Sequence, residues 1–390
     1  MRKSQSIGRA GDVGGEKVAR MTVRLVLNDK GWILEKMAKR LAENLPRWNV
    51  DATIDTRPSQ DSVVNHWMLY TDLSGKAQGI KTMLITHVDR AAKLHVLRRR
   101  LISFDMGICL SRMTMQQLTH AGIPAERLCF ITPAHDGIAS PRRISIGITT
   151  QLRNDGAKRE DLLLDMARTI RLDAFHFEII GPRWEKVIPV LQAAGATVRY
   201  ASGAYQSDNQ QHLKLVHDRL QIIDYYLYFG FDEGSMGFLD ALAAGVPTIA
   251  TPQGFHIDIN DGITYSFRDS TELTAVFQGI SDNRQRRMES VAGLTWNEYA
   301  RQHALVWRAL KSDHPGDISS SLHGGRVFKT PLPDIEKPVA PPYRRGRSLK
   351  WRVTSAMEDI SFVWEFYTNR KLDWTKTLNL FRRFRSILSH

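Results

Sequence analysis

The sequence has only two cysteines among its 390 residues, Cys109 and Cys129, and no Cys/His spacing of the kind that binds a metal ion. Both cysteines lie inside apolar runs that favour strands, so we expect buried free thiols and a reducing compartment. No apolar run approaches the roughly 20 residues that a membrane-spanning helix requires. These absences argue against a disulfide-stapled domain, a cysteine-ligated zinc protein and a protein built from transmembrane helices.

The charge of the chain is positive and unevenly distributed. The formal net charge is +13, and residues 326–390 alone hold 14 Lys and Arg against six Asp and Glu. A basic balance suits nucleic acid, anionic lipid or a phosphorylated substrate. Because no zinc-finger, RRM-like or helix-turn-helix pattern is present, we expect no nucleic-acid partner.

Strand-like and helix-like patterns alternate along most of the chain, which predicts an α/β protein with parallel sheets. The first series opens with the apolar run TVRLVL, a turn at Gly31 and the amphipathic sequence WILEKMAKRLAENL. A second series starts at ISIGITT, and its closing helical pattern runs over residues 282–310. We therefore expect one domain over residues 21–137 and a second over residues 138–311.

The two ends of the chain depart from this alternation. Residues 1–20 are basic but lack the apolar core of a secretory signal, so we expect a disordered leader. Residues 312–350 are rich in proline and poor in apolar residues, which predicts a linker. Residues 351–390 hold two short helical patterns with many basic residues, and they predict a basic amphipathic helical tail.

The segment YYLYFGFDEGSMGFLDALAAGVPTIATPQGFHIDINDGI, residues 225–263, is the most informative part of the sequence. Its apolar start is bounded by a glycine, as a buried strand is. Asp232 and Glu233 then precede Gly234 and Ser235, where backbone amides open a helix and could hold an anion. The helix ends at a Gly-Val-Pro break, and a second short strand follows.

This segment resembles the donor-sugar site of retaining glycosyltransferases of family 4, also called glycosyl transferases group 1. Their signature is a carboxylate, a glycine-rich turn, a second carboxylate at the ninth position, then Ala and Gly-Val-Pro. Residues 295–300 are similar to the start of the closing helix of that family. The resemblance extends over about residues 22–311. It implies the GT-B fold, in which two Rossmann-like, doubly wound domains face each other across a cleft, here followed by the helical tail.

The resemblance also implies an activity. It indicates a retaining hexosyltransferase that moves a sugar from a UDP- or GDP-linked donor to a cell-surface polysaccharide or a lipid-linked glycan. No cofactor or metal is expected, because this family neutralises the leaving diphosphate with cationic side chains and a helix N-terminus. Front-face attack, the usual explanation of retention in this family, requires no dedicated nucleophile.

Two acids compete for the sugar-facing position of the signature. Asp240 stands at the second carboxylate position, and counting back eight residues leads to Asp232. The family, however, usually has Gly directly after its first acid, and here only Glu233 has a Gly neighbour. Either residue could therefore be the catalytic acid, with Glu233 slightly favoured, and Asp240 is expected to bind the ribose hydroxyls.

The diphosphate would be held by two cations and a helix N-terminus. Arg153 and Lys158 have the family's Arg-to-Lys spacing after the first strand of the second domain. The alternative is that both are solvated charges at a helix start, where basic residues are mildly unfavourable against the helix dipole. The backbone amides of Gly234, Ser235 and Met236 are expected to meet the same phosphates.

The first domain contributes two further candidates. His87 follows the run KTMLIT, at a strand end where open α/β sheets bind ligands, and the family commonly has a His there that faces the donor sugar. The alternative is a structural histidine. Gly31 either lets its loop approach the donor phosphate closely or only forms the turn.

The basic tail predicts a contact with an anionic membrane surface, or else packing on the enzyme. The resulting expectation is a cytoplasmic protein that is peripheral on the inner membrane face. Two other functions remain compatible with the sequence: a sugar-nucleotide epimerase of the GT-B type and a non-catalytic scaffold that binds a partner. The scaffold remains an alternative because Asp replaces the usual Glu in the signature and because the first domain is short for the family.

Overall fold

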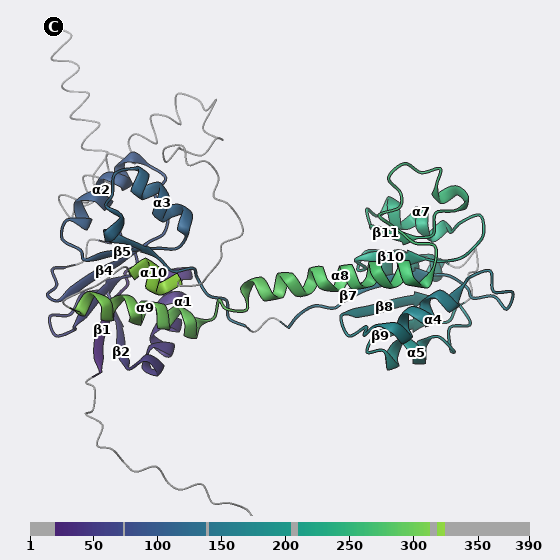
Figure 1. The fold of residues 1–390 in the computed structure, drawn as a ribbon, viewed down its shortest axis with the longest axis horizontal. Coiled ribbons are helices and arrows are strands. Elements are labelled where there is room, and N and C mark those ends of the chain that lie inside the picture. The colour runs from purple at the N-terminus through teal and green to yellow at the C-terminus, as the bar shows by residue number, and fades with distance from the viewer. Residues whose placement is uncertain (1–19, 73–74, 138–139, 204–209, 313–317, 324–390) are drawn as a thin grey trace, which may run out of the picture. The chain divides into compact units, whose positions relative to one another are not determined.

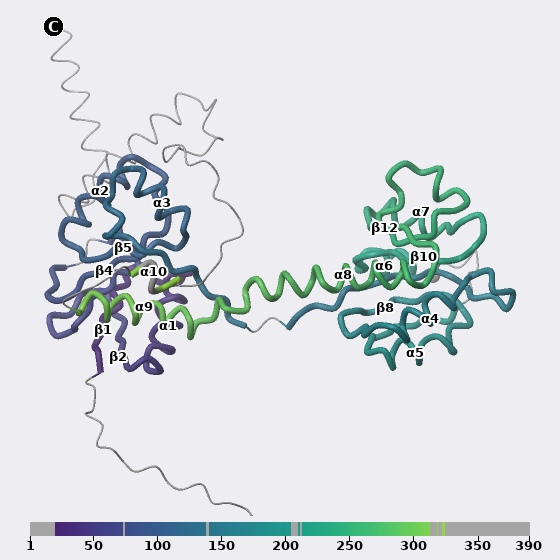
Figure 2. Tube along the Cα trace, viewed as in Figure 1, coloured from purple at the N-terminus to yellow at the C-terminus, as the bar shows by residue number. Residues whose placement is uncertain are grey.

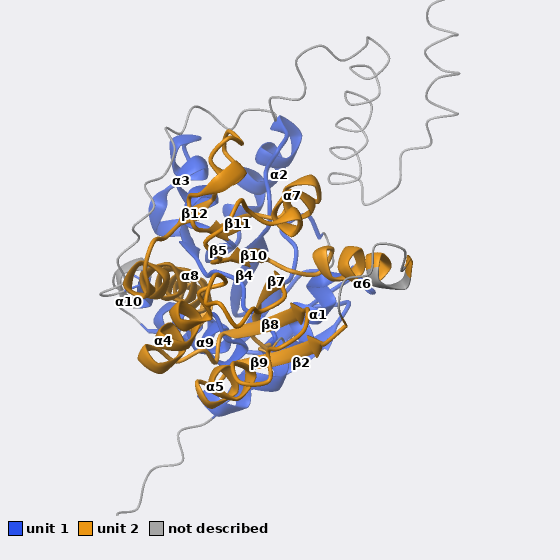
Figure 3. Cartoon of the chain, turned by 90° about the vertical axis from the view of Figure 1, so that its right-hand side faces the viewer, with its two compact units in different colours: residues 1–136, 293–390 blue, residues 137–292 orange. Residues whose placement is uncertain are grey.

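The computed structural model describes residues 20–72, 75–137, 140–203, 210–312 and 318–323 (Figure 1). The chain divides into two compact units, which Figure 3 colours separately. Unit 1 consists of residues 1–136 and 293–390, and unit 2 of residues 137–292. The chain thus leaves the first unit at residue 136 and returns to it at residue 293, a path that can be followed on the trace in Figure 2.

Unit 1 contains a six-stranded parallel sheet with the strand order β2-β1-β3-β4-β5-β6. Its strands are β1 (Met21–Val26), β2 (Val50–Asp55), β3 (Val64–Trp67), β4 (Ile80–Ile85), β5 (Met106–Cys109) and β6 (Leu128–Phe130). Its helices are α1 (Ile33–Asn44), α2 (Ala91–Leu101), α3 (Arg112–His120), α9 (Trp296–Lys311) and α10 (Ile318–His323), with short 3-10 turns η1 (Leu45–Trp48) and η2 (Ala125–Arg127).

Both faces of this sheet are covered, because alternate residues of a strand point to opposite faces. In β4, Leu84 joins a core with α1 and α9, whereas Met83 and Ile85 join a core with α2 and α3. The strands β3 and β5 are buried along their whole length. Burial on both faces explains the apolar sequence of β5, whereas β3 buries the polar residues Asn65 and His66. Cys109 and Cys129 are buried free thiols, as expected, and burial raises the pKa of Cys129 to about 12.

Unit 2 repeats the architecture with a second six-stranded parallel sheet, in the order β12-β11-β10-β7-β8-β9. Its strands are β7 (Ile144–Thr149), β8 (Phe175–Ile180), β9 (Thr197–Ala201), β10 (Tyr225–Tyr228), β11 (Thr248–Ala250) and β12 (Tyr265–Ser266). Its helices are α4 (Glu160–Thr169), α5 (Ile188–Ala193), α6 (Gln210–Leu220), α7 (Met236–Ala243) and α8 (Ser270–Val291), with the 3-10 turn η3 (Gly254–His256). One core holds α4, α5 and α8, and the other holds α6 and α7.

The expectation of two Rossmann-like, doubly wound domains is confirmed. The domain boundary expected at residue 311 falls elsewhere, because α9 belongs to unit 1. The predicted helix over residues 282–310 is interrupted between α8 and α9. In α9 a stripe that includes Tyr299, Ala300 and Trp307 is buried in the core shared with α1, and Trp307 Nε1 donates to Thr82 Oγ1 over 3.1 Å.

The ends of the chain lie largely outside the described residues. The predicted leader over 1–20 does so except for Arg20, and the predicted tail over 351–390 does so entirely. The predicted linker over 312–350 is described at Ser312 and residues 318–323. There it holds α10, whose Ile318 and Leu322 are buried in the core of unit 1. No helix in the described part is long and apolar enough to cross a bilayer.

Candidate functional site

The strand order of unit 2 reverses between β7 and β10. The first three strands run outward from β7 through β8 to β9, and the last three run the other way from β10. Open α/β sheets bind ligands outside the carboxyl ends of the strands at such a reversal. The site is therefore expected after Thr149 and Tyr228, the last residues of these two strands.

The turn after β10 is organised around Asp232. Its Oδ1 accepts hydrogen bonds from the Tyr228 hydroxyl (2.5 Å) and from the Gly234 amide (3.1 Å), and its Oδ2 pairs with Lys158 Nζ at 2.5 Å. Burial alone would raise the pKa of Asp232, but these hydrogen bonds and the positive charge outweigh it and lower the pKa. Asp232 is thus an ionised residue with three partners, which fixes both the turn and the Lys158 ammonium.

Gly234 is required by this turn. Its φ is +122°, and a Cβ at this position would lie 2.7 Å from ring atoms of Phe255. The glycine therefore allows close packing between the turn and η3, and the Phe255 amide donates to the Glu233 carbonyl over 3.0 Å.

The helix α7 begins directly after the turn, and no side chain caps its start. Ser235 occupies the N-cap position, but its hydroxyl contacts the Tyr226 hydroxyl at 3.0 Å instead of capping the helix. Amides of a first helical turn, here including Met236, lack an intrahelical acceptor and attract anions. The amides of Gly234 and Ser235 already donate to Asp232 and His256, so among the described residues only the Met236 amide of the three predicted for the phosphates has no partner.

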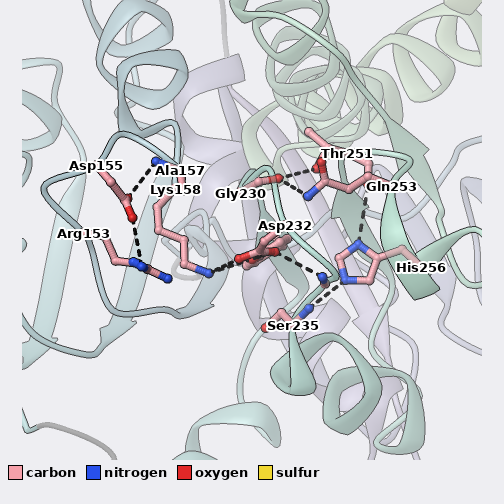
Figure 4. A network of polar contacts seen from close by, with 12 residues as sticks. Arg153, Asp155, Ala157, Lys158, Gly230, Asp232, Ser235, Thr251, Gln253 and His256 are labelled. Atoms are coloured by element: carbon pink, nitrogen blue, oxygen red, sulfur yellow. Dashed lines mark hydrogen bonds and ion pairs between the residues drawn. The ribbon is translucent and has the colours of Figure 1, made fainter.

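His256 stabilises the start of α7 through a hydrogen bond with the backbone of Ser235. Figure 4 shows its ring beside Ser235, whose amide donates to His256 Nε2 over 3.0 Å. Because Nε2 accepts this bond, the ring proton belongs on Nδ1, which lies 3.5 Å from the Thr251 carbonyl. Burial lowers the pKa of His256, although the Thr251 carbonyl and Asp232 act in the opposite direction. The imidazole is therefore a neutral positioning group.

A pocket of about 680 Å³ lies over the strand reversal. Its lining brings together five of the predicted donor-binding residues: Arg153, Lys158, Gly234, Ser235 and Met236. The volume lies within the range of small-molecule sites. We call this the cationic pocket, because its lining also contains Arg183, a residue that was not predicted from the sequence.

The two predicted cations of the cationic pocket already have acidic partners. The Arg153 guanidinium lies 2.9 Å from Asp155, and its side chain is 60% exposed. Lys158 is only 15% exposed and contacts both Asp232 and the Tyr228 hydroxyl, the latter at 2.9 Å. Figure 4 shows both pairs beside the glycine turn. Lys158 is held in a less screened environment than Arg153, so its charge acts more strongly.

Asp240 faces a second pocket next to the first. This pocket of about 440 Å³ also has Pro182, Leu213 and Val216 in its lining, and it shares five lining residues with the cationic pocket: Thr149, Thr150, Gln151, Ser235 and Met236. Among the described residues, none forms a hydrogen bond or ion pair with the Asp240 carboxylate. A carboxylate beside an apolar pocket suits a ligand with both a ring and hydroxyl groups.

Glu233 differs from Asp232 in its surroundings. Its side chain is exposed, and within the part of the chain that the structure describes no group pairs with its carboxylate. Of the two competing acids, Glu233 is thus the one whose carboxylate remains available to a ligand.

His87 and Gly31 belong to unit 1. His87 follows β4, is exposed, and its Nε2 lies 3.2 Å from Lys93 Nζ. An ammonium can only donate, so this ring nitrogen is an acceptor. Gly31 has a φ of +83°, and a Cβ at this position would have no neighbour within 4 Å, which fits a turn-forming role. His66, in β3 of the same unit, is buried and contacts Thr82.

The roles of Tyr226, Tyr228 and His256 were not predicted from the sequence. The two tyrosines alternate within YYLYF, and their hydroxyls reach the turn beyond the strand end. The alternation of residues in a strand predicts that the two tyrosines lie on one face of the sheet, but it does not predict which residues their hydroxyls contact. His256 follows a Gly-Phe pair in a loop, and nothing in the sequence connects it to Ser235. Within the described residues, no group of three or more His, Cys, Asp and Glu is arranged to hold a metal ion.

Sequence comparisons assign no family: no family model matches the chain. No curated protein matches it either. Structural similarity is found to the apo form of the lipopolysaccharide outer core galactosyltransferase WaaB, with 12% identity, 72% of this chain and 97% of that chain covered, and a TM-score of 0.30. A second example is Anabaena HepE in complex with UDP and glucose, with 11% identity, 78% of this chain and 98% of that chain covered, and a TM-score of 0.28. A third is a glycosyltransferase from Rickettsia africae ESF-5, with 10% identity, 75% of this chain and 99% of that chain covered, and a TM-score of 0.29.

Proposed function

We propose that the protein is a glycosyltransferase that binds the diphosphate of a UDP- or GDP-linked sugar in the cationic pocket of unit 2. One observation carries the proposal: Arg153, Lys158 and the amide end of α7 line a single pocket at the strand reversal. These groups are the kinds that stabilise the negative charge that develops on a leaving diphosphate. Their convergence there supports a nucleotide-sugar donor.

Lys158 is the main cation in this proposal. Its low exposure reduces screening, and its partner Asp232 holds the ammonium in place without a ligand. Arg153 is more exposed and can turn from Asp155 toward a phosphate. Together they supply the charge that a metal ion supplies in other transferases, so we expect turnover in the presence of EDTA.

Glu233 is the proposed sugar-facing acid. Asp232 already accepts three bonds, so its role in the proposal is to position Lys158 and Gly234. The carboxylate of Glu233, which pairs with no group among the described residues, can accept hydrogen bonds from sugar hydroxyls. His87 and Gly31 remain the proposed contributions of unit 1, and retention of the anomeric configuration is proposed from the resemblance described above.

Asp240 is proposed to bind the ribose. A carboxylate accepts two hydrogen bonds from a vicinal diol, and the adjoining apolar pocket offers contact area for a base. The nucleoside would then extend from the cationic pocket into the pocket that contains Asp240, since the two share lining residues.

The proposed acceptor is a cell-surface polysaccharide or a lipid-linked glycan, made in the cytoplasm at the inner membrane face. The basic tail supports this part, although it lies outside the described residues. At about 1 kcal/mol per basic residue near an anionic surface, removal of residues 374–390 should weaken binding to anionic vesicles by a few kcal/mol. Equal sedimentation of the full-length and truncated proteins with such vesicles would contradict the membrane contact.

A thermal-shift series tests the proposed function. We expect UDP or GDP, and the corresponding nucleotide sugars, to raise the melting temperature, because a ligand bound only by the native state stabilises it. A coupled assay with and without a glycan acceptor then separates transfer from epimerisation, which releases nucleotide without an acceptor. If no nucleoside diphosphate or nucleotide sugar shifts the melting temperature, the proposal fails and a non-catalytic role is favoured.

A further inference from the structure

We propose that Arg183 is a third diphosphate-binding residue and supplies the one cationic side chain of the pocket lining that has no counter-ion among the described residues. The inference rests on the proposed function, which it deepens by adding a residue. Arg183 follows the Gly-Pro turn at the carboxyl end of β8, on the other side of β7 from the glycine turn. It lines the cationic pocket together with Arg153 and Lys158.

The ion pairs of the pocket distinguish Arg183 from the other two cations. Arg153 is paired with Asp155, and Lys158 with Asp232. Within the described part of the chain, the Arg183 guanidinium forms neither an ion pair nor a hydrogen bond. An incoming diphosphate would have to compete with a carboxylate for Arg153 or Lys158, but not for Arg183. The uncompensated positive charge of the lining is therefore that of Arg183.

The backbone of Arg183 is also in an unusual conformation. Its φ is +75°, a region that favours glycine over residues with a Cβ. Such conformations persist where neighbouring contacts enforce them, and they occur at functional sites more often than elsewhere. Glycine would adopt this φ at a lower cost in free energy, so an arginine at this position indicates a role for its side chain.

The neighbouring contacts that enforce this conformation connect the β8 turn to the loop after β7. The Leu152 amide donates to the Pro182 carbonyl over 3.2 Å, and Trp184 Nε1 donates to the Thr150 carbonyl over 2.8 Å. Trp184 is fully buried. Residues on both sides of Arg183 are thus fixed to the loop that leads to Arg153, and the guanidinium remains exposed at the pocket.

The substitution Arg183→Gly separates the effect of the side chain on ligand binding from the effect of the backbone conformation on stability. We expect it to raise the melting temperature, because the strained φ is relieved, and to weaken binding of UDP or GDP roughly 10- to 100-fold, because a charge-assisted hydrogen bond is lost. Arg183→Lys keeps the charge and the strain, and should retain most of the affinity. Asp261→Gly is the matched control: Asp261 has a φ of +59°, is exposed and lines neither pocket. It should leave the affinity unchanged.

Calorimetric titration with UDP, GDP and inorganic pyrophosphate gives the deciding readout. Unchanged affinity in Arg183→Gly would overturn the inference, while the proposed function would stand. A lower melting temperature together with lost binding would assign Arg183 a structural role and also overturn it. If pyrophosphate binds in an Arg183-dependent way but no nucleoside diphosphate does, the anion site stands and the proposed transferase fails. If the wild-type protein binds none of the three, both are overturned.

Discussion

The two units each contain a six-stranded parallel sheet, but the pockets at the point where the strand order reverses differ in their side chains. In unit 1 the order changes direction between β1 and β3, and a pocket of about 340 Å³ lies there, with Asn28, Asp29 and Asp72 in its lining. In unit 2 the lining of the cationic pocket holds three cations, Arg153, Lys158 and Arg183, and one acid, Asp155. Topology therefore decides where a pocket forms, whereas the side chains after each strand decide which ligand it accepts. An acidic lining repels a diphosphate, which supports the proposed binding of the nucleotide by unit 2.

The units also differ in how they bury histidine. Unit 2 buries His256 next to Ser235, at the start of α7. Unit 1 buries His66 and His303, whose ring centroids lie 5.4 Å apart, and both rings contact Trp307. Burial lowers the pKa of His66 well below its usual range and that of His303 to about 4. Acid should therefore act on the core of unit 1 independently of the binding site.

The largest expected effect is acid destabilisation through His303. The unfolded chain binds a proton near pH 6.5, but the folded chain does so only near pH 4, so stability is lost as the pH falls through this window. The difference corresponds to about 3 kcal/mol. Denaturant unfolding from pH 7.5 to 4.5 should show this loss. His303→Phe should reduce the pH slope by about one proton, and the exposed His120→Gln should not. An unchanged slope in His303→Phe would contradict the account of unit 1.

The next effect sharpens the assignment of the cations to unit 2. Lys158→Ala and Arg153→Ala should each lose roughly 1.5–3 kcal/mol of transition-state stabilisation. We expect Lys158→Ala to lose more, because its side chain is the less exposed. The control Lys214→Ala removes an exposed pair with Asp218 in the same unit and should keep its kcat/KM. Steady-state kinetics with and without EDTA measure both effects, and a strict metal requirement would contradict the charge assignment.

A smaller effect separates the three acids. Asp240→Asn should weaken nucleotide binding by about 1 kcal/mol, the value of a typical hydrogen bond, while Glu233→Gln should mainly lower kcat. Titration of the nucleotide and turnover rates distinguish the two. Normal turnover in both variants would show that the site is assigned to the wrong residues. If Asp232→Asn alone abolishes activity with Lys158 still in place, Asp232 is the sugar-facing acid.

The sequence predicted the sheets well because many buried parallel strands are continuous apolar runs, as in YYLYF. Five of the predicted donor-binding residues line one pocket, since each follows a strand end or opens a helix, and their role in binding stays a prediction. The boundary between the units could not be predicted in the same way. The buried stripe of α9 shows that the helix packs on a core, but not on which one, and the contact between Trp307 and Thr82 joins residues 225 positions apart.

Arg183 shows a second limit of the sequence. Its position after FHFEIIGP marks a strand end, so a ligand-facing role could have been considered. Its positive φ, however, is held by contacts with the loop after β7, which is distant in sequence, and its lack of a counter-ion among the described residues is visible only in the structure. The role of His256 was hidden for the same reason, because its partner Ser235 lies 21 residues earlier.

Hydrogen exchange with and without UDP or GDP tests whether the nucleotide binds at the strand reversal of unit 2. We expect slower exchange over residues 149–158 and 228–240, which carry Arg153, Lys158 and the start of α7. Residues 64–72 of unit 1, beside its acidic pocket, should exchange as before. Protection of residues 64–72 with no change over 149–158 and 228–240 would contradict the claim.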